Sequence, residues 1–150
     1  MKRSVVAVLA AVCIAGAATF SLAGTPQEEA NKKAVLEFYD TALNQMDFAA
    51  AAKYFGPRYI QHNPLAADGI EGFRKFLEFR KQKFPNAKSV VKRALADGDF
   101  VILHVHAIRE PGERGVAIVD IFRLENGKIV EHWDVIQAIP EKAANDNGMF

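Results

Sequence analysis

The stretch VAIVDIFRLENGKIVEHWDVIQ, residues 116–137, decides the fold class of this chain. It contains two apolar runs separated by Asn126-Gly127, a dipeptide typical of β-hairpin turns. The second run carries two polar residues, His132 and Asp134. Because side chains two positions apart on a strand project from the same face, His132 and Asp134 are expected to share one face of the sheet. That face either meets water or lines a pocket.

The length of the turn decides which residues lie opposite each other in this hairpin. A two-residue turn at the Asn-Gly dipeptide would place Asp120 opposite Trp133. A three-residue loop that also includes Glu125 would place Asp120 opposite His132. The sequence permits both. We favour the longer loop, because it gathers the polar groups on one face and avoids scattering charges over both sides of a central sheet.

Two further strand-like segments, residues 88–98 and 99–110, precede the hairpin and end at turn signals. Helical spacing of apolar residues covers the chain before them. One helix begins at the Thr25 N-cap and runs to about Asp47, and a short one follows over residues 48–55. Another helix follows a capping box formed by Asp68 and Glu71. Helices followed by an antiparallel meander predict an α+β fold, with the helices on one face of a curved sheet.

Polar side chains occur at several positions where a core strand would carry apolar ones. They are Tyr59, His62, Asn63, His104, His106, Asp120, His132 and Asp134. Asp120 is the most informative, because apolar residues flank it on both faces of its strand. Burying this carboxylate without a partner would cost several kcal/mol, roughly, so it either has buried partners or lines a cavity. A structural carboxylate bonded to a histidine is the alternative interpretation.

The spacing of the four histidines predicts no metal site. No HExxH or HxxxH pattern lies on a helix, and His104 and His106, two apart on one strand, are a weak signal. A hydrolase-type nucleophile is also not indicated, because no GxSxG motif is present. The glycines are scattered and form no phosphate-binding loop. We therefore expect neither a metal nor an organic cofactor.

The N-terminal segment, residues 1–23, has the layout of a secretory signal peptide. Lys2 and Arg3 precede an apolar run that ends in small residues around Ala23. A retained membrane anchor is the alternative, but the run is rich in alanine. Cleavage would leave one domain, residues 24–150, in the periplasm or outside the cell. The single cysteine, Cys13, lies in the segment removed, so no disulfide is expected.

The composition limits the classes of partner. The chain has 150 residues, half of them hydrophobic, which fits one globular domain. Lysine and arginine total 19, against 18 acidic residues. Without a basic excess, nucleic acid is not expected as a partner, nor is a membrane surface once the signal segment is removed.

The segments YIQHNPLAADGIEGF, residues 59–73, and DIFRLENGKIVEHWDVIQ, residues 120–137, resemble the SnoaL-like family of the nuclear transport factor 2-like (NTF2-like) superfamily. The resemblance extends from about Glu28 to the C-terminal residues. It implies a cone, formed by a curved sheet around a long helix, with a pocket at its wide end. It also implies a homodimer packed sheet to sheet.

The resemblance further suggests a reaction. The enzyme that gives this family its name closes polyketide rings by aldol condensation without a cofactor, and Asp134 matches its proposed acid/base aspartate. Ketosteroid isomerase is a more distant relative, and Asp120 resembles its protonated, hydrogen-bond-donating aspartic acid. The general base of that isomerase has no match here, which argues against steroid isomerisation.

These observations lead to a functional hypothesis: an exported, cofactor-free enzyme that moves a proton next to a carbonyl of a small apolar substrate. Asp134 would be the acid/base, oriented by His104 or His132, while Asp120 and His62 would hold the oxygen. Four residues would border the substrate: Tyr59, Asn63, His106 and Trp133. The rival hypothesis is a module without catalysis that binds a small hydrophobic ligand or dimerises, because one fold serves many tasks.

Overall fold

The computed structural model describes residues 24–150. The predicted signal peptide, residues 1–23, lies outside this part of the chain. Within residues 24–150, no helix combines the length and the apolar character that are needed to cross a membrane.

The first helix, α1 (Pro26–Tyr39), begins as the sequence predicts. The Thr25 hydroxyl accepts from the backbone N–H of Glu28, and the Glu28 carboxylate accepts from the backbone N–H of Thr25. The helix continues as a π-helical turn, η1 (Asp40–Asn44). Asp47 then caps α2 (Phe48–Ala51), which passes into a short 3-10 helix, η2 (Ala52–Tyr54). The predicted helical region is thus confirmed, with its π-helical turn as an addition.

Strand β1 (Phe55–Gln61) leads through a loop to α3 (Gly69–Lys83). Asp68 is the N-cap residue of α3, but its side chain makes no capping hydrogen bond, so the predicted capping box is wrong. The Asp68 carboxylate instead accepts from the backbone N–H of Gln61, at 2.8 Å. The residue therefore ties the end of β1 to the start of α3.

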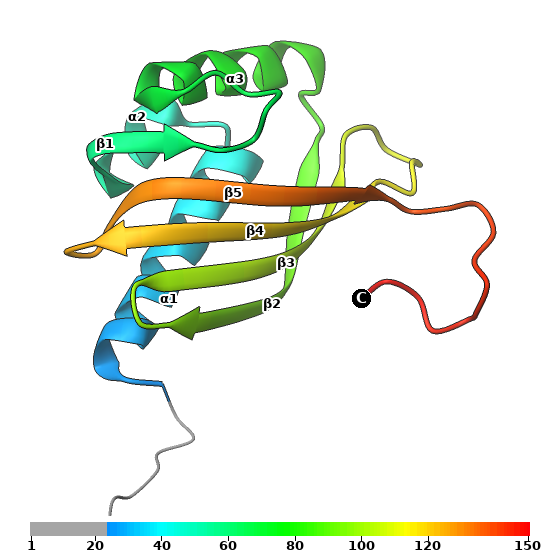
Figure 1. The fold of residues 1–150 in the computed structure, drawn as a ribbon. Helices are drawn as coiled ribbons and strands as arrows, with labels where there is room; N and C mark the ends of the chain where they lie inside the picture. Colours follow the sequence, from blue (N-terminus) through cyan, green and yellow to red (C-terminus); the bar gives the residue numbers. More distant parts are fainter. Residues whose placement is uncertain (1–23) are drawn as a thin grey trace, which may run out of the picture.

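Four antiparallel strands complete the sheet: β2 (Lys88–Asp97), β3 (Phe100–Ile108), β4 (Val116–Glu125) and β5 (Lys128–Ala138). Strand β1 adds parallel to β5, which gives the order β1-β5-β4-β3-β2. Figure 1 shows α1 crossing one face of this curved sheet and α3 above its β1 edge, whereas the C-terminal tail extends beyond the end of β5. The architecture confirms the predicted α+β class with a mainly antiparallel sheet.

The β4–β5 hairpin has a register that differs from both sequence-based alternatives. Asn126 and Gly127 have positive φ angles of 51° and 71°, so the turn has two residues and Glu125 pairs with Lys128. An extra residue on β5, Val130, then shifts the pairing by one position. Asp120 therefore lies opposite Asp134, and the predicted three-residue loop is wrong.

The helices and the inner face of the sheet enclose the core. Phe38 of α1 packs against Phe55, Phe73 and Phe122, with ring centroids 5.2–5.9 Å apart. Leu103 and other aliphatic side chains of β3 to β5 complete this core and are fully buried. Residues that point from the sheet towards α1 are therefore shielded from water, which defines the environment of any polar group among them.

Candidate functional site

A group of polar side chains lies on the inner face of the sheet, among these core residues. Asp120 of β4 and His132 of β5 are buried, with 5% and 7% of their surface exposed. Asp134 shares this face, because it lies directly opposite Asp120 in the hairpin. The favoured three-residue loop predicted that these three polar groups would share one face. They do share it, because the one-residue bulge on β5 has the same effect on the pairing.

Asp120 is held by two hydrogen bonds from different parts of the fold. The Tyr39 hydroxyl, from the last turn of α1, donates to Oδ2 over 2.9 Å. The Nε2 atom of His132 lies 3.0 Å from Oδ1. Burial, and next to it the nearby Asp120 carboxylate, raises the pKa of Tyr39 well above its usual value, so Tyr39 stays protonated and donates. Both oxygens of Asp120 are therefore engaged.

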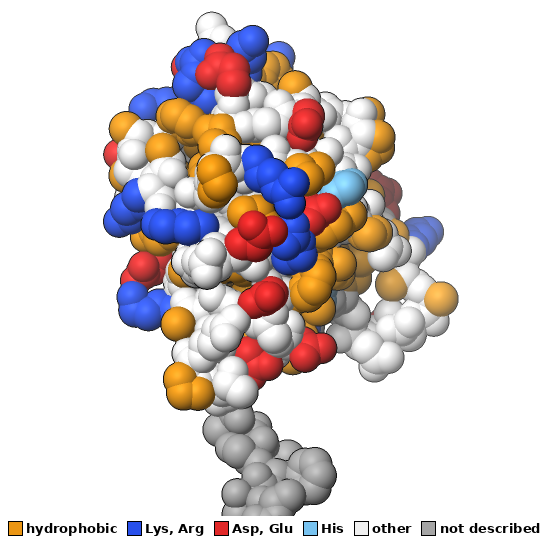
Figure 2. Space-filling view, turned by 60° about the vertical axis from the view of Figure 1, so that its left-hand side comes forward, with side chains coloured by type: hydrophobic (Ala, Val, Ile, Leu, Met, Phe, Trp, Pro, Cys, Tyr) orange, Lys and Arg blue, Asp and Glu red, His pale blue; other side chains and the backbone are white. Residues whose placement is uncertain are grey.

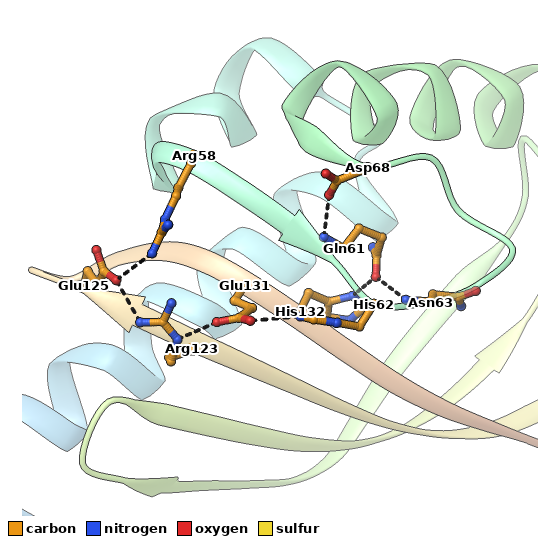
Figure 3. A network of polar contacts seen from close by, with 9 residues as sticks. All are labelled: Arg58, Gln61, His62, Asn63, Asp68, Arg123, Glu125, Glu131 and His132. Carbon is orange, nitrogen blue, oxygen red and sulfur yellow. Dashed lines mark hydrogen bonds and ion pairs between the residues drawn. The ribbon is translucent and has the colours of Figure 1, made fainter.

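His132 is bonded at both ring nitrogens. Its Nδ1 atom lies 3.0 Å from the side-chain oxygen of Gln61, the last residue of β1. Gln61 is the Cα partner of His132 in the parallel β1–β5 pairing, so the two side chains emerge side by side (Figure 3). The His132 ring also packs against Phe122, at a centroid distance of 4.7 Å. The ring is thus fixed in position and orientation.

Asp134 lies nearer the surface than Asp120 and has a different partner. The Asn63 amide, in the loop after β1, donates to both of its carboxylate oxygens at 2.8 Å. Asp134 is intermediate in exposure, and no lysine or arginine within residues 24–150 forms an ion pair with it. The site therefore contains a buried carboxylate, that of Asp120, and a partly exposed one, that of Asp134.

Tyr59 borders the same group from β1 and is 4% exposed. Its hydroxyl oxygen accepts from the Gln61 amide nitrogen at 3.0 Å. Burial raises the pKa of Tyr59, and the nearby carboxylates of Asp120 and Asp134 add to the increase. A hydroxyl that stays protonated and accepts from Gln61 keeps its own O–H to donate.

The structure places four of the predicted site residues on the outer face of the sheet. Leu103 pairs with Asp120 and so faces inwards, which directs the neighbouring His104 outwards, and His106 with it. Their rings lie 5.2 and 4.7 Å from that of Phe150, the last residue of the chain. His104 therefore does not orient Asp134, and His106 does not border the inner polar group, contrary to the sequence-based hypothesis.

His62 and Trp133 form a stacked pair on that outer face. Trp133 lies between His132 and Asp134 in β5 and so projects to the opposite side of the sheet. Its ring is 4.5 Å from that of His62, with an angle of 4° between their planes. Because of this arrangement, His62 does not reach the inner oxygen site assigned to it from the sequence, and Trp133 does not border that site.

A row of charged groups holds His62 on the outer face. His62 Nε2 lies 2.8 Å from Glu131, which also accepts from Arg123 at 2.6 Å (Figure 3). Arg123 also forms an ion pair with Glu125. Arg58 of β1 lies 3.6 Å from the Glu125 carboxylate. Figure 2 shows basic and acidic side chains next to each other near the middle of this view, with a histidine beside them. The row joins β1 to the β4–β5 hairpin and favours a structural role for His62.

The outer face also carries a groove of about 500 Å³. Val119 and Val135 of the sheet form one wall, and Pro140, Ala144 and Met149 of the C-terminal tail form another. This groove lies on the side of the sheet opposite Asp120, since Val119 and Asp120 are consecutive on β4. It is therefore separate from the inner polar group.

Asp120, His132 and Asp134 could also offer ligands to a metal ion, because one donor atom from each lies within 4.8 Å of the others. Both oxygens of Asp120 and both ring nitrogens of His132 already make hydrogen bonds, so an ion would have to displace one of these bonds at each residue. This grouping was not visible in the spacing of the sequence, which contains no metal-binding motif.

Two residues of the inner group were missed in the sequence: Tyr39 and Gln61. Tyr39 occupies an apolar position of the helical pattern, where a tyrosine is usually core packing. Gln61 stands beside the more conspicuous His62, but the alternation along β1 turns Gln61 inwards and His62 outwards. That alternation was the one feature of the sequence that could have identified Gln61 as an inner residue.

The site geometry can be compared with known families. The model of the SnoaL-like domain matches residues 35–132. The chain belongs to the SnoaL-like domain family. All residues of the inner group except Asp134 fall inside the matched range, and Asp134 follows two residues after its end. No curated protein matches this SnoaL-like chain.

Solved structures share the fold of this SnoaL-like protein. A proposed SnoaL-like polyketide cyclase from Jannaschia sp. CCS1 is 23% identical, with a TM-score of 0.64, over 77% of this chain and 91% of the other. A proposed ketosteroid isomerase from Kribbella flavida is 17% identical, with a TM-score of 0.65, over 79% and 86%. TsrD from Streptomyces laurentii is 22% identical, with a TM-score of 0.60, over 71% and 88%. These similarities confirm the predicted NTF2-like cone.

Proposed function

We propose that this SnoaL-like protein is an acid/base catalyst, independent of cofactors, that moves a proton next to a carbonyl in a small apolar molecule. An aldol cyclase or an isomerase reaction would fit, since both begin by forming an enolate. The observation that carries the proposal is the pair of opposed aspartates inside an apolar, aromatic-lined face, held in different hydrogen-bonding environments. The polyketide cyclase and ketosteroid isomerase named among the structural neighbours support the same class of reaction.

Asp134 is the proposed base. Its carboxylate is half-open and is oriented by one neutral partner, the Asn63 amide, which leaves lone pairs for a substrate proton. Asp120 is a poorer choice, because it is 5% exposed and enclosed by Tyr39 and His132, which keep a substrate away from its oxygens. Asp120 therefore helps to position His132 and does not itself hold the substrate oxygen.

Tyr59 is the proposed hydrogen-bond donor to the developing oxygen anion. Its hydroxyl accepts from Gln61 and keeps its own proton, and burial within the core strengthens any hydrogen bond that it donates. This assignment replaces the oxygen-holding role that the sequence gave to His62 and Asp120. The base and the donor would then act from neighbouring strands, β5 and β1.

The loss of α-protons from simple ketones tests the proposal, because every substrate of this class must lose such a proton. A panel of cyclic ketones and 1,3-diketones is incubated with the protein in deuterated buffer, and proton NMR follows exchange at the carbon next to the carbonyl. We expect accelerated exchange with at least one apolar member of the panel and loss of this acceleration in Asp134→Asn. Asp97→Asn, an exposed aspartate on β2, is the matched control and should exchange at the unaltered rate. Exchange at the buffer rate throughout would contradict the proposal.

A dimerisation role is a second candidate that the outer face of the sheet favours. Val90, Leu95, Phe100, Val119 and Val135 of the outer face are between 38% and 69% exposed, an unusual concentration for side chains of this kind. A second copy packed against this face would bury them in a homodimer. Light scattering coupled to gel filtration measures the mass in solution, and Val135→Asp should convert a dimer into a monomer, whereas a monomeric wild type would contradict the idea.

Export remains part of the proposal, on the evidence of the N-terminal sequence. Residues 1–23 would be removed and the mature protein would begin at about Gly24. Intact-mass measurement of protein from the periplasm or the medium gives the start of the mature chain. Recovery of the full-length mass in the membrane fraction would instead indicate a retained anchor.

A further inference from the structure

Gln61 lies between three polar groups of the inner site. Its amide nitrogen donates to the Tyr59 hydroxyl at 3.0 Å, and its amide oxygen faces both Asn63 and His132. The backbone N–H of Asn63 donates to that oxygen over 2.9 Å. Because a backbone N–H can only donate, the atom facing it must be the oxygen, and the orientation of the Gln61 amide is fixed.

This orientation determines where the protons of His132 lie. The Gln61 oxygen is an acceptor, so the Nδ1 atom of His132, 3.0 Å away, must carry a hydrogen. A flipped imidazole ring would lose both of its hydrogen bonds, to Gln61 and to Asp120, so the ring orientation is fixed as well.

The remaining contact of His132 then contains one proton. Nε2 and the Asp120 oxygen are 3.0 Å apart, and two bare lone pairs would repel each other at this distance. The pair is therefore either an imidazolium with a carboxylate or an imidazole with a carboxylic acid. It has no net charge in either form, as its deep burial requires.

We propose that Gln61 is a positioning residue that holds His132 in the form protonated at Nδ1, so that His132 and Asp120 share a single proton as a neutral unit. The unit can pass its proton between two atoms, but it is buried and enclosed by its own partners, so a substrate reaches it less easily than Asp134. Asp134 then remains as the base. Tyr59, whose hydroxyl is aligned by the Gln61 amide, remains as the hydrogen-bond donor to the substrate oxygen. The catalytic meaning of this arrangement rests on the proposed function, whereas the proton positions do not.

Nitrogen NMR of the histidine rings tests the proton positions in the free protein. Long-range proton–nitrogen correlation spectra distinguish a protonated ring nitrogen from a bare one. His62→Gln, His104→Gln and His106→Gln, all on the outer face, identify the other three rings, and the remaining ring is that of His132. We expect a protonated Nδ1 in the wild-type protein. A bare Nδ1 with a protonated Nε2 would overturn the proposal.

Variants of Gln61 test its part in the arrangement. Gln61→Leu removes the acceptor, and we expect the Nδ1 signal of His132 to shift towards that of a bare nitrogen. Gln61→Glu keeps an acceptor oxygen and should retain the protonated signal. Gln137→Leu, an exposed glutamine on the neighbouring strand β5, is the control and should leave the signals unchanged. An unchanged His132 spectrum in Gln61→Leu would show that Gln61 does not set the tautomer.

These spectra also separate the inference from the proposed function. If Nδ1 is protonated and Gln61→Leu alters it, but no ketone exchanges its protons, the acid/base function fails and the inference stands. If exchange occurs while Nδ1 is bare, the function stands and the role of Gln61 is refuted. Should Gln61→Leu not fold, the wild-type spectrum and that of Gln61→Glu still decide the outcome.

Discussion

Asp120 and Asp134 occupy directly opposite positions on β4 and β5, and both side chains lie on the inner face of the sheet, Asp120 buried and Asp134 partly exposed. Like charges placed opposite each other across two strands are destabilising, especially where water is excluded. The fold reduces this repulsion by giving each carboxylate its own partners: Tyr39 and His132 for Asp120, and Asn63 for Asp134. Two chemically equal side chains thereby have different hydrogen-bond partners and different exposure.

Substitution of the two aspartates should therefore have unequal effects. Asp134→Asn should lower the exchange or turnover rate by about 10²–10⁴-fold, the usual contribution of a general base, because an amide preserves the shape but cannot take a proton. Asp120→Asn should cost less, since its amide can still hydrogen-bond to His132 and Tyr39. The measurement is the rate of α-proton exchange, together with thermal melts that exclude unfolding.

Asp120→Leu should be worse than Asp120→Asn in both activity and stability. Leucine leaves the buried Tyr39 hydroxyl and the Nε2 atom of His132 without a hydrogen-bond partner, at about 1–3 kcal/mol for each. Denaturant melts of the two variants measure the difference in the free energy of unfolding. Full activity in Asp134→Asn would show that Asp134 is not the base. Equal stability of the two Asp120 variants would show that the Tyr39 hydroxyl and His132 Nε2 find other hydrogen-bond partners.

The carboxylate of Glu28 should make stability depend on pH. Hydrogen bonds from the backbone of Gly98, and then from Thr25, lower the pKa of Glu28 below the ordinary carboxyl value. Since the lowered pKa belongs to the folded state, the stabilisation is present above the ordinary value of 4.5 and is lost as the pH falls through the folded pKa. Glu28→Gln should thus be less stable than wild type at pH 7, and the difference should disappear in acid.

Urea melts from pH 7 to pH 3 measure this dependence. Glu29→Gln is the control, because Glu29 is in the same helical turn and its side chain pairs with Lys32. A constant difference between Glu28→Gln and wild type at all pH values would indicate that the packing or shape of the side chain, and not its charge, is responsible.

Gly72 should be required for the loop that carries Asn63. A Cβ atom at this position of α3 would lie 2.2 Å from the backbone oxygen of Ala67, so the helix and the loop could not approach as they do. Gly72→Ala should destabilise the protein by about 1–3 kcal/mol, as overpacking usually does. Gly69→Ala is the control, because a Cβ at Gly69 would have no neighbour within 4 Å and the substitution tests backbone strain alone. In thermal melts, Gly69→Ala should lower the stability less than Gly72→Ala does.

The fold and any activity should be independent of metal ions. Every side-chain oxygen of Asp120 and ring nitrogen of His132 is already engaged in a hydrogen bond, and an ion would have to break one at each residue. After dialysis against a chelator, elemental analysis should find less than stoichiometric metal, and melting temperature and exchange rate should be unchanged. One tightly held ion per chain, lost in Asp134→Asn, would refute this expectation.

The sequence by itself determined the local elements of this protein. Helical spacing and the Thr25–Glu28 capping box located α1, and alternating apolar residues with Asn126-Gly127 located the hairpin. These signals are local, because a cap, a period or a turn depends on residues a few positions apart. The same patterns, together with two characteristic segments, were enough to indicate the family.

Only the tertiary structure decided which polar residues meet. The bulge at Val130 set the register of the hairpin, and the parallel pairing of β1 with β5 brought Gln61 and Asn63 to His132 and Asp134. A shift of one residue on a strand exchanges its two faces, so small local irregularities separated the outer histidines from the inner one. Packing across the whole sheet favours these irregularities, and no short stretch of sequence contains that information.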